Sequence, residues 1–114
     1  MEIRIIQDKI SRPELEQIAS ITFGELVKAV VDLEKGIIAI GGDLHSDEEA
    51  LLLEQGSKQE NLWGINLYPK DTSEKWIEFD SVINIRPTLN NRSRGVENPK
   101  VKEKIVKIVN SLVK

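Results

Sequence analysis

Two aliphatic stretches separated by a short turn most constrain what this chain can fold into. In the first stretch, from Leu26 to Leu33, aliphatic side chains alternate with Lys28 and Asp32, which is the period of a strand with one buried face. The second stretch runs from Gly36 to Gly41, and Gly36 suits the positive φ of a tight turn. The two stretches therefore predict a β-hairpin.

Capping signals predict one helix near each end of the chain. Ser11 is followed three residues later by Glu14, as in a capping box, and this first helix is expected to end at Gly24. Asn98 followed by Pro99 is typical of a helix N-terminus and begins the last predicted helix. Aliphatic residues at helical spacing give each of the two helices a face to bury.

Alternating patterns predict further strands over Met1–Ile6, Ile65–Tyr68 and Trp76–Arg86. In the last of these, Ile77, Phe79, Ile83 and Ile85 are expected to face inward, with Glu78, Asp80, Asn84 and Arg86 facing outward. A single helical turn is predicted from Ser57 through Trp63, and Gly64 is expected to break it.

Residues 49–55 fit either a strand or a helix. The capping box at Ser46 and the run Ala-Leu-Leu-Leu-Glu favour a helix by propensity. Because only a few residues separate this cap from Gly56, such a helix would need tertiary support, and a strand is favoured. The order of elements then predicts an α+β fold. Its antiparallel or mixed β-sheet has about five or six strands, and the N-terminal and C-terminal helices pack on one face.

Composition bounds the class of protein. The 114 residues are expected to form one domain, 1–114, with a mainly aliphatic core. The absence of cysteine, of a secretory leader and of a long apolar run predicts a cytoplasmic protein that does not span a membrane. A net charge of -3 argues against a general nucleic-acid coat, although a local basic patch remains compatible with it.

Three sequence blocks resemble a family of short prokaryotic proteins that is classed only as a domain of unknown function. The blocks are LVKAVVDLEKGIIAIGGDLHSDEEALLLEQGS, QENLWGINLYP and WIEFDSVINIRP with NNRSRGVE, and together they cover nearly the whole chain. The resemblance implies a self-standing bacterial or archaeal domain. It implies no activity, cofactor or catalytic residue, so any chemistry must be argued from the side chains.

The polar faces of two predicted strands form the first candidate site. If the aliphatic residues face the helices, Asn66 and Tyr68 face outward on one strand, and Asn84 and Arg86 face outward with Asp80 on another. Neighbouring strands lie about 4.8 Å apart, so these groups can converge. The alternative is a solvated face whose charges only pair with one another.

The polar loop after Pro87 is the second candidate. Arg86, Arg92 and Arg94 fall within nine residues and are interspersed with Asn91 and other polar groups. Arginine offers a planar fork for bidentate contact with phosphate or carboxylate. Together with Asn66 and Asn84, these four residues form the predicted anion-binding set, unless the arginines simply pair with surface acids.

The third candidate is the acidic segment around the only histidine. Asp43, His45 and Asp47 alternate, and on an extended segment they would lie on one side, where they could hold a divalent cation with Asp80. His45 could instead be a general base oriented by Asp43 or Asp47. An acidic loop can equally be solvated or cap the element that follows it.

Two classes of function follow from these candidates. The favoured class is a binding or interaction module for an anionic partner such as a nucleotide, RNA or an acidic protein segment. The alternative is a small metal-assisted phosphoester hydrolase, with the acidic residues holding the ion. The sequence leaves open whether the protein is an enzyme. Pairing of the first strand between copies would also give a homodimer.

Overall fold

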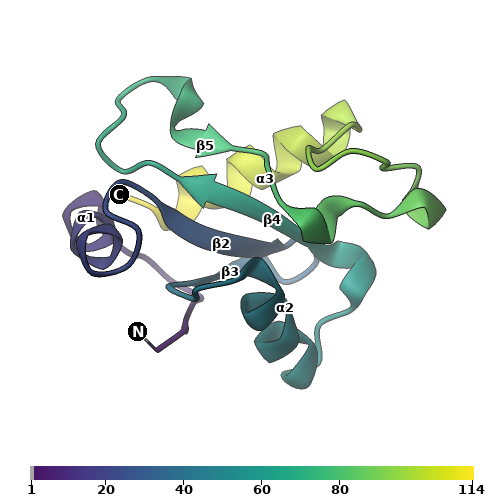
Figure 1. The fold of residues 1–114 in the computed structure, drawn as a ribbon, viewed down its shortest axis with the longest axis horizontal. Helices are drawn as coiled ribbons and strands as arrows, with labels where there is room; N and C mark the ends of the chain where they lie inside the picture. The colour runs from purple at the N-terminus through teal and green to yellow at the C-terminus, as the bar shows by residue number, and fades with distance from the viewer. Residues whose placement is uncertain (1) are drawn as a thin grey trace.

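The computed structural model describes residues 2–114, and its centre is a five-stranded antiparallel sheet (Figure 1). The strands are β1 (Arg4–Ile6), β2 (Val27–Asp32), β3 (Ile37–Ile40), β4 (Leu62–Leu67) and β5 (Ile77–Glu78), in the spatial order β1-β3-β2-β4-β5. The predicted hairpin is confirmed as β2 and β3, and Gly36 has a φ of 66° in its turn. The first strand is shorter than predicted, and Met1 lies outside the described residues.

Helices α1 (Arg12–Ile21) and α3 (Pro99–Leu112) cover one face of the sheet. Ser11 and Asn98 are N-caps as predicted: Ser11 Oγ accepts from the Glu14 amide at 3.2 Å, and Asn98 Oδ1 accepts from the Lys100 amide at 2.9 Å. The reciprocal half of the predicted capping box is not formed, because the Glu14 carboxylate pairs with Arg4 at 2.8 Å. Leu15 of α1 and Ile105 of α3 are fully buried against the sheet. The predicted α+β fold, with its terminal helices on one face, is confirmed.

The opposite face of the sheet is covered by a third helix, α2 (His45–Glu54). The favoured strand over residues 49–55 is therefore wrong. Leu52 of α2 packs on Val30, Ala39 and Leu62, so the sheet supplies the tertiary support that a helix of ten residues requires. The capping box also fails, because Leu44 is the N-cap and makes no side-chain cap bond.

The predicted strand Trp76–Arg86 is wrong over most of its length. Of the predicted strand, only the part that forms β5 pairs with β4. The residues before it, Glu74–Trp76, form the 3-10 turn η2, and the chain after it continues through η3 (Val82–Asn84) and η4 (Pro87–Leu89). The expected alternation reverses at its end, since Asn84 is fully buried and Ile85 is 43% exposed. The predicted helical turn is also shorter, because η1 spans Gln59–Asn61 and β4 runs straight through Gly64.

The side chain of Asn84 explains where β5 stops. Its Oδ1 accepts from the Gly64 amide at 2.8 Å, and its Nδ2 donates to the Gly64 carbonyl at 2.9 Å and to the Arg94 carbonyl at 2.9 Å. One amide thus takes the place of a strand partner on this side of β4. Ser81 can lie close to β4 because Gly64 has no side chain: a Cβ added at Gly64 would lie 2.6 Å from Ser81 Oγ.

Two further findings complete the description of the fold. No helix within residues 2–114 is both long and apolar enough to cross a membrane. Strand β1 pairs only with β3 and forms one edge of the sheet, so pairing between copies through this edge stays a prediction.

Replacing Asn84 with alanine is expected to destabilise the fold by about 3 kcal/mol or more, because buried backbone groups lose their only side-chain partner. Urea denaturation measures the free energy of unfolding. Asn110→Ala, at an exposed position of α3, is the control and should change it by less than about 0.5 kcal/mol. Equal effects of the two substitutions would contradict the role given to Asn84.

Candidate functional site

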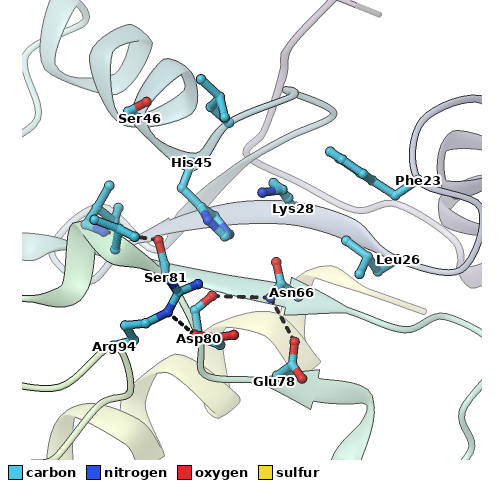
Figure 2. A pocket seen from close by; sticks show the side chains of 13 residues that line it. Phe23, Leu26, Lys28, His45, Ser46, Asn66, Glu78, Asp80, Ser81 and Arg94 are labelled. Carbon is cyan, nitrogen blue, oxygen red and sulfur yellow. Dashed lines mark hydrogen bonds and ion pairs between the residues drawn. The ribbon is translucent and has the colours of Figure 1, made fainter.

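A pocket of about 480 Å³ lies where α2 meets the β4–β5 end of the sheet (Figure 2). Its floor is the sheet face that carries Lys28 on β2, Asn66 on β4 and Glu78 on β5. Lys28 pairs in register with Asn66, and Asn66 pairs with Glu78. The three side chains therefore form a row across three neighbouring strands, from an ammonium through an amide to a carboxylate. We call these three residues the polar row.

Lys28 is the half-buried cation of the polar row. Within residues 2–114 its ammonium group makes no ion pair or hydrogen bond, and its nearest aromatic contact is the Phe23 ring, 5.2 Å from Nζ to the ring centroid. A cation–π contact of this length leaves the ammonium group free to form an ion pair. Lys28 therefore presents positive charge to the pocket without a carboxylate to neutralise it.

Asn66 is 7% exposed and is held by its nitrogen. Asn66 Nδ2 donates to Glu78 Oε1 at 2.9 Å and to the Asp80 carbonyl at 3.2 Å. Its Oδ1 is buried and has no hydrogen-bond partner in the described chain. Figure 2 shows this oxygen pointing away from Glu78, toward the side from which Lys28 and His45 project. The pocket thus contains a buried acceptor that lacks a donor.

His45 begins α2 and points down toward the polar row (Figure 2). Its Nε2 lies 2.8 Å from the Ile65 carbonyl, which only accepts, so Nε2 carries the proton. Burial lowers the pKa of His45, and the charge on Lys28 lowers it further, so the ring is neutral at pH 7. The Asn66 side chain is near enough to favour the protonated ring, yet its Oδ1 does not reach hydrogen-bond geometry.

Asp80 and Arg94 form an ion pair at the mouth of the pocket, with Arg94 Nε 2.6 Å from Asp80 Oδ1. Both side chains are about half exposed, so solvent screens the pair. The contact uses only Nε, and the terminal nitrogens of Arg94 make no hydrogen bond within residues 2–114. Arg94 is therefore the second cation that can reach a ligand here.

The rim of the pocket is apolar and open to solvent. Phe23, Leu44 and Val82 line it and are 44%, 54% and 63% exposed. Pockets that combine an apolar wall with a few convergent polar groups are typical sites for small molecules, and about 300–1,000 Å³ is their usual size. The site therefore has the size and the lining of a small-molecule pocket.

The other predicted arginines lie elsewhere. Arg86 is paired with Glu49 of α2 at 3.2 Å, both side chains are nearly buried, and its guanidinium lies 5.2 Å from the Trp63 ring centroid. Arg92 is exposed, and its backbone amide donates to Glu97. Neither Arg86 nor Arg92 lines the pocket with Arg94.

The predicted asparagines divide between the pocket and the scaffold. Asn66 lines the pocket, whereas Asn84 is fully buried and bonds to backbone. Asn91 is also buried, and its Nδ2 donates to the carbonyls of Asn84, Ser93 and Gly95, which holds the polar loop in shape. The structure therefore brings Asn66 and Arg94 of the predicted set together.

The acidic segment does not converge on one point. Asp43 and Asp47 are exposed, while His45 between them is buried and turned toward the sheet, because this segment starts a helix instead of running extended. Across residues 2–114 there is no group of three or more His, Asp or Glu side chains that could hold a metal ion. Asp80 is the only other predicted ligand near His45, and both line the pocket.

Lys28 and Glu78 were not selected from the sequence as site residues. The alternation in the hairpin did place Lys28 on the polar face of its strand, and the same reasoning placed Glu78 outward. The missing information was the register, since only the pairing of β2 with β4 and of β4 with β5 puts both beside Asn66. A lysine within an aliphatic strand was the signal that could have directed attention to this face.

Fold and site together define a small α+β domain with an open polar pocket on one side of its sheet. The model of a family described as "Protein of unknown function (DUF5674)" matches residues 4–112, and the chain belongs to that family. Comparison with curated proteins and with solved structures gives no significant match. The family carries no assigned activity, so the function has to be inferred from the pocket.

Glu48 of α2 is a fully buried carboxyl group that does not line the pocket. Its Oε2 accepts from the Gly42 amide at 3.0 Å, and its Oε1 has no partner in the described chain. Burial raises its pKa to about 9, against which the Gly42 hydrogen bond and the charge on Lys28 act only in part. The carboxyl group is therefore neutral in the folded protein at pH 7.

The raised pKa of Glu48 predicts that stability falls as pH rises. In the unfolded chain the carboxyl group ionises near 4.5, whereas in the folded chain it stays protonated to about 9. Within this window the folded state binds one more proton, so each pH unit removes about 1.4 kcal/mol of stability. Glu48→Gln keeps an acceptor for Gly42 and should abolish this slope, as measured by urea denaturation at two pH values inside the window.

Glu54→Gln removes an exposed carboxylate from the same helix and is the matched control. It should retain the wild-type dependence of unfolding free energy on pH. A Glu48→Gln variant with an unchanged slope would show that Glu48 is ionised in the folded protein.

Proposed function

We propose that this protein is a binding module that recognises a small ligand through its carboxylate or phosphate group. The observation that carries the proposal is half-buried Lys28, which lines the pocket and whose ammonium group has no carboxylate partner within residues 2–114. An ammonium group without such a partner can form a charge-assisted contact with an anionic ligand group. Lys28 is therefore the primary anchor of the proposed site.

The groups around Lys28 support an anionic ligand group. Arg94 adds a second cation with unused terminal nitrogens, whereas His45 is neutral and adds no positive charge. Asp80 holds Arg94 at the pocket mouth but binds only its Nε. An arginine anchored in this way retains a fork of donors for bidentate contact with carboxylate or phosphate.

The geometry favours a small ligand over an extended nucleic acid. The pocket has a volume of about 480 Å³ and has apolar side chains around its rim. A nucleic-acid surface instead needs several cations spaced along a track, and the net charge of this chain is -3. Nucleotides and acidic peptide ends remain within the proposed class, because each carries a terminal anionic group.

Lys28→Met is expected to remove the response to anions, because it keeps the aliphatic stem and deletes the charge. Thermal melting with inorganic phosphate or 4-methylpentanoate, at matched ionic strength, should raise the Tm of the wild type, since ligands of the native state stabilise it. The variant should show no rise. Lys100→Met, which makes the same charge change at an exposed position of α3, should respond like the wild type.

Two arginines of one loop provide a second, internally matched test. Arg94→Gln should weaken anion binding roughly tenfold or more, since a hydrogen bond to a charged group contributes about 1.5–3 kcal/mol. Arg92→Gln makes the same change two residues away, outside the pocket, and should leave the dissociation constant unchanged. Isothermal titration calorimetry measures both, and equal losses would point to a general charge effect.

The same melts separate the binding module from the metal-assisted hydrolase. A rise in Tm with Mg²⁺, Mn²⁺ or Zn²⁺ that Asp43→Ala or His45→Ala abolishes would favour the hydrolase. A rise with anions alone that depends on Lys28 supports the proposal made here. A wild-type Tm that responds to no anion would overturn it.

A further inference from the structure

We infer that the ligand is an α-amino acid with an apolar side chain, bound with its carboxylate at Lys28 and its ammonium group at Asn66 and Glu78. This inference rests on the proposed function, because it assigns the anionic group to the same lysine. It adds a second recognition element, the hydrogen-bond acceptors of Asn66 and Glu78 in the polar row, and a third, the apolar rim.

The unpartnered acceptor of Asn66 in the polar row requires a hydrogen-bond donor on the ligand. Asn66 Oδ1 is buried without a partner, and only 7% of Asn66 is exposed to solvent. The amide cannot rotate to relieve this, since Nδ2 is held by Glu78 and by the Asp80 carbonyl. A buried acceptor is stable only when a donor reaches it, and a ligand N–H is the donor that the described chain does not supply.

Glu78 makes that donor a cation. The Tyr68 hydroxyl and Asn66 Nδ2 both donate to Glu78 Oε1, at 3.2 and 2.9 Å, which leaves Oε2 without a partner within residues 2–114. A carboxylate oxygen without a partner is an acceptor that stabilises an ammonium group. The two hydrogen bonds hold the Glu78 carboxylate through Oε1.

The spacing along the row suits charges that lie close together on one molecule. Lys28, Asn66 and Glu78 occupy successive strands in register, and neighbouring strands lie about 4.8 Å apart. A ligand above Asn66 can therefore reach the Lys28 ammonium on one side and the Glu78 carboxylate on the other. The carboxylate and ammonium of an α-amino acid are attached to one carbon and meet this requirement.

The charge balance of the pocket also fits a molecule without net charge. Lys28 and Arg94 contribute two cations, Glu78 and Asp80 contribute two carboxylates, and His45 is uncharged. Because Asp80 is paired with Arg94, a simple anion would leave only the Glu78 carboxylate without a cation, whereas an amphoteric ligand supplies one. Figure 2 shows Phe23 and Leu26 beside the row, to the right of Lys28 and Asn66 in this view, where an apolar ligand side chain would find contact.

Three matched probes test the inference: leucine, 4-methylpentanoate, which lacks its amine, and 3-methylbutylamine, which lacks its carboxylate. Titration followed by the ¹⁵N NMR signals of Lys28 and of the Asn66 side-chain amide reports binding at this pocket. Leucine should bind at least roughly tenfold more tightly than either half-molecule, because each half loses one charge-assisted contact. Glycine should also bind more weakly than leucine, because it lacks the apolar side chain.

Two variants assign the ends of the ligand. Glu78→Gln keeps an oxygen that accepts from Tyr68 and Asn66 but removes the negative charge. It should therefore weaken the binding of leucine roughly tenfold and leave the binding of 4-methylpentanoate unchanged. Lys28→Met should weaken the binding of both leucine and 4-methylpentanoate. Chemical shifts of the core amides confirm that each variant is folded.

The possible failures are distinguishable. Equal binding of leucine and 4-methylpentanoate would overturn the assignment of the ammonium site and leave the proposed anion recognition intact. Binding of 3-methylbutylamine without either acid would overturn the proposed function as well. If none of the three probes shifts the pocket signals while phosphate does, the amino-acid inference is wrong and the anion site stands.

Discussion

The contact on which this structure most depends is the one between the Asn84 side chain and the backbone of Gly64. A side-chain amide carries the same donor and acceptor as a peptide group, so it can satisfy a strand edge without a further strand. The chain is thereby released from the sheet after Glu78 and turns back over it. Asp80, Ser81 and Arg94 reach the pocket only because of this turn.

The layer that covers this face of the sheet is divided into an apolar and a polar part. In the apolar part, Leu52 of α2 packs against Val30 and Leu62. In the polar part, His45 at the N-terminus of the same helix lies over the polar row. The helix has little hydrophobic periodicity in its sequence, because its buried residues are a histidine, an acid and a leucine: His45, Glu48 and Leu52. Its position is set by the sheet, and the pocket is the space that it leaves uncovered.

Local patterns were sufficient for part of the fold and insufficient for the rest. The hairpin and the terminal helices follow from alternation and caps, which act over a few neighbouring residues. Helix α2 forms because a sheet face needs cover, and the burial of Asn84 reflects a partner twenty residues away; neither leaves a periodic signal. At the site, Asn66 and Arg94 belong to the predicted anion-binding set and His45 and Asp80 to the predicted metal set, and Lys28 joins them only through strand register.

The way in which β4 is covered also affects how this molecule meets its own copies. Open strand margins recruit further strands, and this is a common route to aggregation. Beside Gly64 that route is shut, since the amide of Asn84 occupies both hydrogen-bonding positions and Ser81 fills the space above. A further strand could therefore add only at the edge strands themselves, the three residues of β1 and the two residues of β5.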